Sequence, residues 1–254
     1  MSHPFLIVIG FRVNNSEHNT SGYSLSWLEV LKFLLYNPVW VKYVVDWQLS
    51  LKIKRKNASA SIFDRGVPWL TYAAIDWLNT YLQPDMKVFE YGSGGSTMYF
   101  AQRVECLVSV EHNKNWFDRV NRILQSNGIS NTKLLLVEPE KKADRTMNNN
   151  KYSSFTFPKY REHNFERYVK TINDYPNSFF NLVVVDGRAR VACIAESLSK
   201  IQNGGYLVLD NSERVHYKEA FDLMSEYPKK DFFGFGPLLN TFWNTTIWKI
   251  NRLV

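Results

Sequence analysis

The chain has 254 residues, of which 45% are hydrophobic and 22% are charged, a composition typical of a soluble globular protein with room for one large α/β domain and an extension. Its net charge of +7 admits anionic small molecules, anionic membrane surfaces and nucleic acid as partners. The basic residues are mostly scattered and form no RNA-binding signature, so a nucleic-acid partner gains no support. Only two cysteines are present, which excludes a disulfide framework, and we expect a cytoplasmic protein.

Residues 1–62 are predicted to form a helical extension. The spacing of apolar residues favours one helix from Ser24 to Tyr36 and, after Pro38, a second helix to about Leu51 that leads into the basic run Lys52–Lys56. Interspersed charges and Pro38 make this stretch a poor membrane span. Two roles for residues 24–56 stay open, a helical cap that forms a homodimer surface and an element that contacts a membrane surface.

Residues 63–254 are predicted to form a second unit, which begins with a helix. Pro68 suits a first helical position, and the apolar residues Leu70, Ala74 and Trp77 recur on one face of the helix that would follow. Pro84 closes this helix before the first predicted strand.

The most informative stretch is Met86–Asn113, which is predicted to form a strand, a glycine turn, a helix and a second strand. The four segments are Lys87–Tyr91, Gly92–Gly95, Ser96–Arg103 and Leu107–Val110, and the last leads into Glu111. Glycine lets a backbone approach a ligand closely, and a helix N-terminus offers free N–H groups. An acid at the tip of the second strand suits the hydroxyl groups of a ribose.

Strands and helices alternate through the rest of the chain. Strands are expected at 133–137, 181–186, 206–209, 231–235 and 245–250, and helices at 113–128, 165–172, 191–201 and 212–227. This alternation predicts a mostly parallel sheet with helices on both faces. The last two strands have no helix between them, so we expect an antiparallel C-terminal hairpin.

The pattern E-x-G-S-G-G-S, from Glu90 to Ser96, departs from the dinucleotide fingerprint because Thr97 stands where that fingerprint has glycine. It resembles motif I of the Rossmann-like (class I) S-adenosylmethionine-dependent methyltransferases, and the resemblance covers about 66–254. It implies the seven-stranded Rossmann-like fold of that family, with S-adenosylmethionine as cofactor. The cofactor-binding residues that it implies are Glu90, Gly92, Ser93, Gly94, Glu111, His112, Glu138 and Asp186. His112 has a second interpretation, as a neighbour of a helix cap.

Asp186, Asp210 and Asn211 follow two adjacent strands, and their oxygens suit Mg²⁺. They resemble the metal triad of the catechol and caffeoyl-CoA O-methyltransferases, although Ala189 stands where those families carry a lysine. Three interpretations stay open. Asp186, Asp210 and Asn211 bind a metal; Asp186 orients the acceptor while Arg188 and Arg190 bind its carboxylate or phosphate; or Arg188 pairs with an acid and pins the loops. The candidate catalytic residues are Asp186, Arg188 and Asp210.

The expected function is therefore methyl transfer from S-adenosylmethionine to an oxygen of a small, anionic or sugar-like acceptor. Its pocket is expected to draw on Tyr152–Tyr160, Ser212–Arg214 and Phe232–Trp243. Two alternatives remain: a non-catalytic protein that binds the cofactor or a partner on the same fold, and an aminopropyltransferase-like enzyme.

Overall fold

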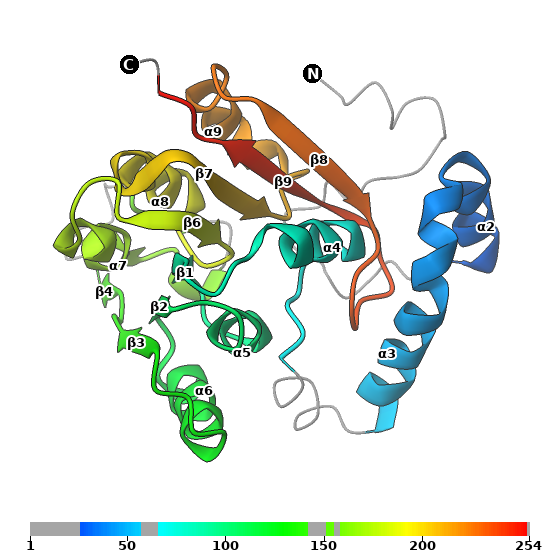
Figure 1. Ribbon diagram of the computed structural model, residues 1–254, viewed down its shortest axis with the longest axis horizontal. Helices are drawn as coiled ribbons and strands as arrows, with labels where there is room; N and C mark the ends of the chain where they lie inside the picture. Colours follow the sequence, from blue (N-terminus) through cyan, green and yellow to red (C-terminus); the bar gives the residue numbers. More distant parts are fainter. Residues whose placement is uncertain (1–25, 57–65, 142–150, 155–157, 253–254) are drawn as a thin grey trace.

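The computed structural model describes residues 26–56, 66–141, 151–154 and 158–252. A seven-stranded sheet in the order β3-β2-β1-β6-β7-β9-β8 forms its centre (Figure 1). The strands are β1 Lys87–Tyr91, β2 Cys106–Glu111, β3 Thr132–Leu136, β6 Phe180–Val185, β7 Ile201–Asp210, β8 Lys229–Gly234 and β9 Trp243–Lys249. The first five are parallel, and β9 runs antiparallel between β7 and the edge strand β8. The predicted mostly parallel sheet and C-terminal hairpin are confirmed.

Helices cover both faces of this sheet. One face carries α4 Tyr72–Tyr81, α5 Gly95–Ala101 and α6 Lys114–Ser126, and the other carries α7 Glu166–Lys170, α8 Arg190–Ser197 and α9 Lys218–Leu223. Neighbouring strand residues point to opposite layers, since Val88 packs in the first and Phe89 in the second. Short 3₁₀ segments, at Thr171–Asp174, Leu198–Lys200 and Val215–Tyr217, extend the second layer. β4 Glu140–Lys141 and β5 His163–Asn164 form a separate two-stranded sheet.

Helix α4 begins at Tyr72, so the prediction that Pro68 opens it is wrong. The reason is a tertiary contact. Thr71 is extended, its hydroxyl donates to Phe232 O at 2.9 Å, and the N–H of Tyr72 donates to Phe235 O at 3.1 Å. The C-terminal hairpin thus takes the backbone groups that an earlier helix start would have used. No local signal in the sequence reveals a competitor so far along the chain.

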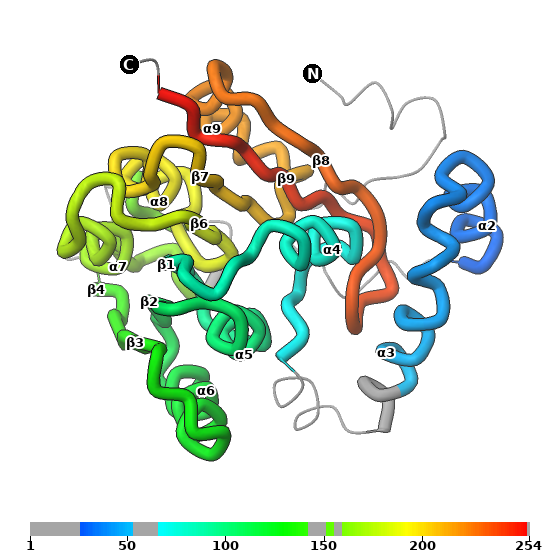
Figure 2. Tube along the Cα trace, viewed as in Figure 1, coloured from blue at the N-terminus to red at the C-terminus, as the bar shows by residue number. Residues whose placement is uncertain are grey.

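The helical extension is present in the described range as α2 Trp27–Tyr36, the 3₁₀ helix η1 Pro38–Tyr43 and α3 Val44–Lys56. A capping box between Ser26 and Glu29 starts α2. The extension lies at one side of the molecule, beside the loop between β8 and β9 (Figure 2). The predicted start at Ser24 and the boundary at residue 62 fall outside the described residues. None of the helices in the described ranges has the length and hydropathy of a membrane span.

An aromatic cluster fixes the extension to the α/β domain. Trp47 stacks on Phe235 with ring centroids 4.8 Å apart, and its Nε1 donates to Leu239 O at 2.8 Å. Trp40 occupies the space that a Cβ on Gly234 would need, which explains a glycine at the end of β8. The described part of the extension therefore shares a core with the C-terminal hairpin.

Candidate cofactor and acceptor site

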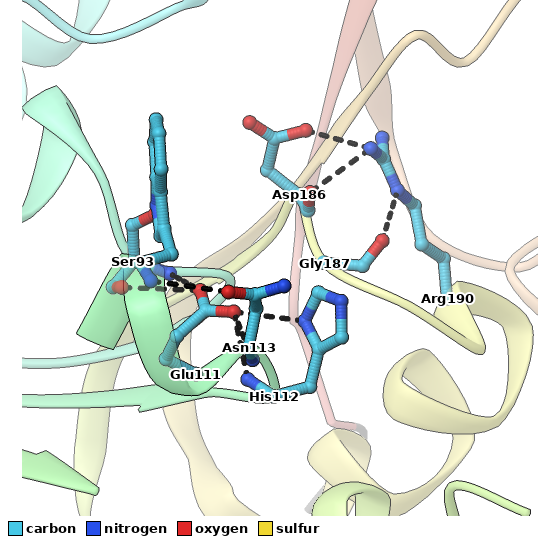
Figure 3. Close-up of polar contacts among 8 residues, drawn as sticks. Ser93, Glu111, His112, Asn113, Asp186, Gly187 and Arg190 are labelled. Atoms are coloured by element: carbon cyan, nitrogen blue, oxygen red, sulfur yellow. Dashed lines mark hydrogen bonds and ion pairs between the residues drawn. The ribbon is translucent and has the colours of Figure 1, made fainter. Parts of the chain in front are cut away.

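The polar residues predicted as a site gather at the carboxyl ends of β1, β2, β6 and β7. These strands are neighbours in the sheet, and the loops that follow them meet at one edge. Figure 3 shows Ser93, Glu111 and His112 on one side of this edge and Asp186, Gly187 and Arg190 on the other. The sheet order thus brings together residues that lie almost a hundred positions apart in the chain.

The glycine turn lets two of these loops, the one after β1 and the one after β6, approach each other closely. Gly92 has φ +94°, and a Cβ there would lie 2.8 Å from the Cα and the N of Gly187. Its N–H donates to Val110 O at 2.9 Å. Gly92 is therefore required because the β1 and β6 loops cross at this point. Gly94 precedes α5, and its N–H donates to Thr97 Oγ1 at 2.9 Å.

Glu90 is fully buried below this turn. Its Oε2 accepts hydrogen bonds from Thr97 Oγ1 at 2.7 Å and from Ser109 Oγ at 2.5 Å. Within the described part of the chain, Oε1 has no hydrogen-bond partner. Burial raises the pKa of Glu90 to about 7, although the hydroxyl groups of Ser109, Ser96 and Thr97 lower it. An unsatisfied carboxyl oxygen below a glycine turn fits a ligand that brings a donor or a positive charge.

Glu111 ends β2 and is also buried, but its carboxylate is held on all sides. Oε1 accepts from the N–H groups of His112 at 2.8 Å and Asn113 at 2.7 Å, and Oε2 accepts from the N–H of Ser93 at 3.2 Å and its Oγ at 3.1 Å. Burial raises its pKa, but the hydrogen bond and charge of His112 and the two backbone donors outweigh burial and leave the pKa below the usual value. Glu111 is thus an oriented anion beside the glycine turn.

His112 lies between Glu111 and a group of rings. Its Nδ1 is 2.9 Å from Glu111 Oε1, and its ring centroid is 5.1 Å from that of Tyr160 and 5.7 Å from that of Phe165. The next residue, Asn113, is the cap of α6, because its side chain accepts from the N–H of Trp116 at 3.1 Å. Both interpretations of His112 are compatible with this position.

Glu138 is exposed and lies one residue beyond Val137, whose N–H donates to Glu111 O at 2.8 Å. Its assignment to the adenine pocket stays a prediction. The predicted acceptor segment Tyr152–Tyr160 is described only in part, since residues 155–157 fall outside the described ranges. Within that segment, Tyr160 belongs to the ring group around His112.

Arg190 ties the ends of β6 and β7 together. Its Nε donates to Gly187 O at 3.1 Å, Nη1 to Asp210 O at 2.5 Å, and Nη2 to the O and the Oδ1 of Asp186 at 3.0 and 2.7 Å. The Arg190 side chain is 7% exposed and that of Asp186 is 26% exposed. The loop-pinning role predicted for Arg188 thus belongs to Arg190, whose guanidinium makes four hydrogen bonds to the ends of β6 and β7.

Arg188 lies on the aromatic side of the site. Its guanidinium carbon is 5.4 Å from the ring centroid of Tyr160. Burial and the nearby charge of Arg190 lower its pKa. Of the two arginines, Arg188 is therefore the one placed beside the rings next to His112.

Asp210 is buried behind the site, where its Oδ1 accepts from Trp243 Nε1 at 3.0 Å and from Thr245 Oγ1 at 2.7 Å. Burial and the charge of Asp186 raise its pKa well above the usual value. Asp210 therefore connects the edge of the site to β9 and to the loop before it.

The predicted magnesium triad does not fit this arrangement. Asn211 Oδ1 accepts from Arg214 at 3.0 Å, and Asp186 Oδ1 pairs with Arg190. Two of the three candidate ligands thus hold guanidinium groups, whose charge opposes a cation. Across the described ranges, His, Cys, Asp and Glu side chains form no group of three or more that could hold a metal.

Sequence reasoning missed two residues that hold Glu90. Thr97 appears in the sequence only as the residue that breaks the dinucleotide fingerprint, yet it joins Glu90 to the N–H of Gly94. Ser109 lies opposite Glu90 in the register of β1 and β2. The available signal was a polar residue inside each of two apolar strands, Glu90 in β1 and Ser109 in β2. It predicts a contact between the two side chains only once the pairing of the strands is known.

Comparison with known proteins identifies solved structures that share this architecture. No family model and no curated protein sequence matches the chain. Among solved structures, a candidate O-methyltransferase from Klebsiella pneumoniae is 13% identical, with a TM-score of 0.53 over 81% of this chain and 97% of that one. The cofactor-bound structure of Rv0187 from MTB is 15% identical, with a TM-score of 0.51 over 77% and 89%. The chain therefore has the Rossmann-like fold of the class I S-adenosylmethionine-dependent methyltransferases.

Proposed function

We propose that the protein is an S-adenosylmethionine-dependent methyltransferase that acts on an oxygen of a small acceptor. The observation that carries the proposal is Glu111, a buried anion oriented by three backbone N–H groups beside a glycine turn. The hydroxyl of Ser93 occupies one acceptor position of Glu111 at 3.1 Å. A ribose hydroxyl of the cofactor would take the place of this donor, because both make the same bond to the carboxylate.

The free oxygen of Glu90 supports the same assignment. A buried carboxyl group with an unsatisfied oxygen is costly unless a ligand completes it. S-adenosylmethionine carries an ammonium group and a sulfonium group, and it supplies an activated methyl group when bound. Glu90 would therefore face its methionine part and Glu111 its ribose, and the turn between them would pass along it.

The acceptor would lie on the side of Asp186 and Arg188. Oδ1 of Asp186 pairs with Arg190, and the other carboxylate oxygen points away from Arg190 (Figure 3). Burial raises the pKa of Asp186, which makes it a better proton acceptor. We assign Asp186 to orient and deprotonate the acceptor hydroxyl and Arg188 to bind a flat or anionic part of it. Methyl transfer needs alignment above all, so positioning would supply much of the rate.

Calorimetric titration with S-adenosylmethionine and S-adenosylhomocysteine tests the proposal. We expect micromolar binding of both ligands by the wild type. Glu111→Gln should weaken binding by about 10- to 150-fold, because it removes hydrogen bonds to a charged acceptor. The matched control is Glu105→Gln, an exposed acid just before the other end of β2, which should bind as the wild type does.

The outcomes separate the candidate functions. Absence of binding to either ligand would reject the proposal. Equal affinity of the Glu111→Gln variant and the wild type would reject the role of Glu111. Binding without methyl transfer to any hydroxyl acceptor would favour the non-catalytic alternative, and a preference for decarboxylated S-adenosylmethionine would favour the aminopropyltransferase alternative.

A further inference from the structure

The helical extension presents apolar side chains on its outer side as well as toward the domain. On α2, Val30 and Phe33 are buried, whereas Leu28, Leu31 and Leu35 recur on the opposite face and are exposed. The outer apolar face, as we define it, consists of Leu28, Leu31, Leu35, Val39, Val45 and Leu49. It draws residues from each of α2, η1 and α3.

This concentration is unusual within the molecule. Outside the extension, the exposed large apolar side chains of the described ranges are Trp69, Val215 and Leu223, which lie in separate segments. Isolated exposed apolar residues are ordinary, whereas many exposed apolar residues gathered on one short segment mark an interaction surface.

The outer apolar face is held rigidly. Behind it, Phe33 packs on Phe242 with ring centroids 4.5 Å apart, and the N–H of Leu238 donates to Ser50 Oγ at 3.0 Å. Lys42 pairs with Asp76 of α4 at 2.6 Å. These contacts leave α2 and α3 as an outer layer of the molecule, with the sheet on their inner side (Figures 1 and 2).

Positive charge accompanies this face. Lys32 and Lys52 are exposed on α2 and α3, and α3 ends in the basic run Lys52–Lys56. Of the two acids on the described extension, Glu29 bonds the cap Ser26 and Asp46 is exposed. An apolar face with a lysine-rich end is complementary to a layer that has an apolar interior and anionic groups at its boundary with water.

We propose that the outer apolar face docks on an anionic lipid bilayer, with its leucines and valines in the interfacial layer and the basic end of α3 among the headgroups. Charge favours a bilayer over a second copy of the chain. A second copy of the chain would bring a further net charge of +7 toward the first, whereas an anionic bilayer supplies the opposite charge. The extension lies on the membrane and does not cross it.

Co-sedimentation of the full chain with vesicles tests this proposal. The vesicles are phosphatidylcholine alone and phosphatidylcholine with about 30% phosphatidylglycerol. The test variant, Leu31→Glu with Leu35→Glu, changes side chains that are 54% and 80% exposed, so the fold should survive. The matched control, Val215→Glu with Leu223→Glu, adds the same charge at residues that are 69% and 41% exposed outside the extension.

We expect the wild type and the control to bind the anionic vesicles, and to bind less at high salt. The test variant should lose at least about tenfold in the partition coefficient, because two leucines no longer enter the interface. Failure of the wild type to bind, or equal binding by the test variant, would overturn the proposal. A dimer in sedimentation equilibrium that the test variant dissociates, without vesicle binding, would overturn it in favour of a homodimer interface. Neither result depends on the cofactor site.

Discussion

Glu90→Gln offers a direct test of the buried carboxyl group below the glycine turn. The pKa of Glu90 is raised from 4.5 to about 7 in the folded protein. Between these values the folded state keeps its proton while the unfolded state has lost it. Stability therefore falls as the pH rises, because the unfolded state binds fewer protons. A difference of about 2.5 pKa units corresponds to about 3 kcal/mol of unfolding free energy.

The variant isolates this contribution because glutamine cannot titrate. Other groups affect both proteins alike and cancel in the difference between them. We expect the wild type to lose about 3 kcal/mol relative to Glu90→Gln between about pH 4.5 and pH 8. The introduced glutamine leaves an amide donor at the unpartnered position, which costs about 1–3 kcal/mol at every pH and does not alter the slope.

Urea unfolding followed by far-ultraviolet circular dichroism, at several pH values in this range, measures the difference. Glu105→Gln, which changes an exposed carboxyl group, should follow the wild type throughout. A difference between wild type and Glu90→Gln that stays constant within about 0.5 kcal/mol would refute the reasoning, since Glu90 would then titrate alike in both states.

Three further substitutions test other contacts. Ser93→Ala removes the hydroxyl that the ribose of the cofactor is proposed to displace. The affinity for S-adenosylmethionine, measured by calorimetry, should therefore change by less than about threefold. A loss of affinity as large as that of Glu111→Gln would contradict this. Arg190→Lys cannot reproduce the guanidinium bonds to the loops after β6 and β7. It should therefore lower the unfolding free energy by about 3 kcal/mol. Unchanged urea unfolding would argue that Arg190 does not hold these loops together. Gly92→Ala should destabilise by more than about 2 kcal/mol, because its Cβ would meet backbone at 2.8 Å; an unchanged melting temperature would show that the loops can separate.

The elements that sequence reasoning predicted well are those with a strong local pattern. The β-branched run of β6 and the apolar strand β1 that leads into the glycine turn identify themselves within a few residues. Asn113 is also a local signal, for the start of α6, because the side chain of a helix cap bonds to a backbone N–H within the next three residues. Because parallel strands end at one edge, the same reasoning brings Glu90, Glu111 and Asp186 into one site.

Contacts between distant segments could not be predicted in this way. The start of α4 depends on Phe232 and Phe235, more than 150 residues away. Likewise, nothing in the sequence D-G-R-A-R tells which arginine pins the loops, because that depends on where the helix begins. Ala189 is left-handed and α8 starts at Arg190, which turns the second arginine back toward Asp186.

The contact between the helical extension and the C-terminal hairpin also sets an order of events during synthesis. Trp47 bonds to Leu239, which lies 192 residues later in the chain. At the usual speed of translation, this partner is made about 10–40 s after Trp47. Throughout that interval the inner side of α2 and α3 lacks its protein partner, so a chaperone or a bilayer can meet it first. The inner side of the extension is thus completed only after the C-terminal hairpin has been made.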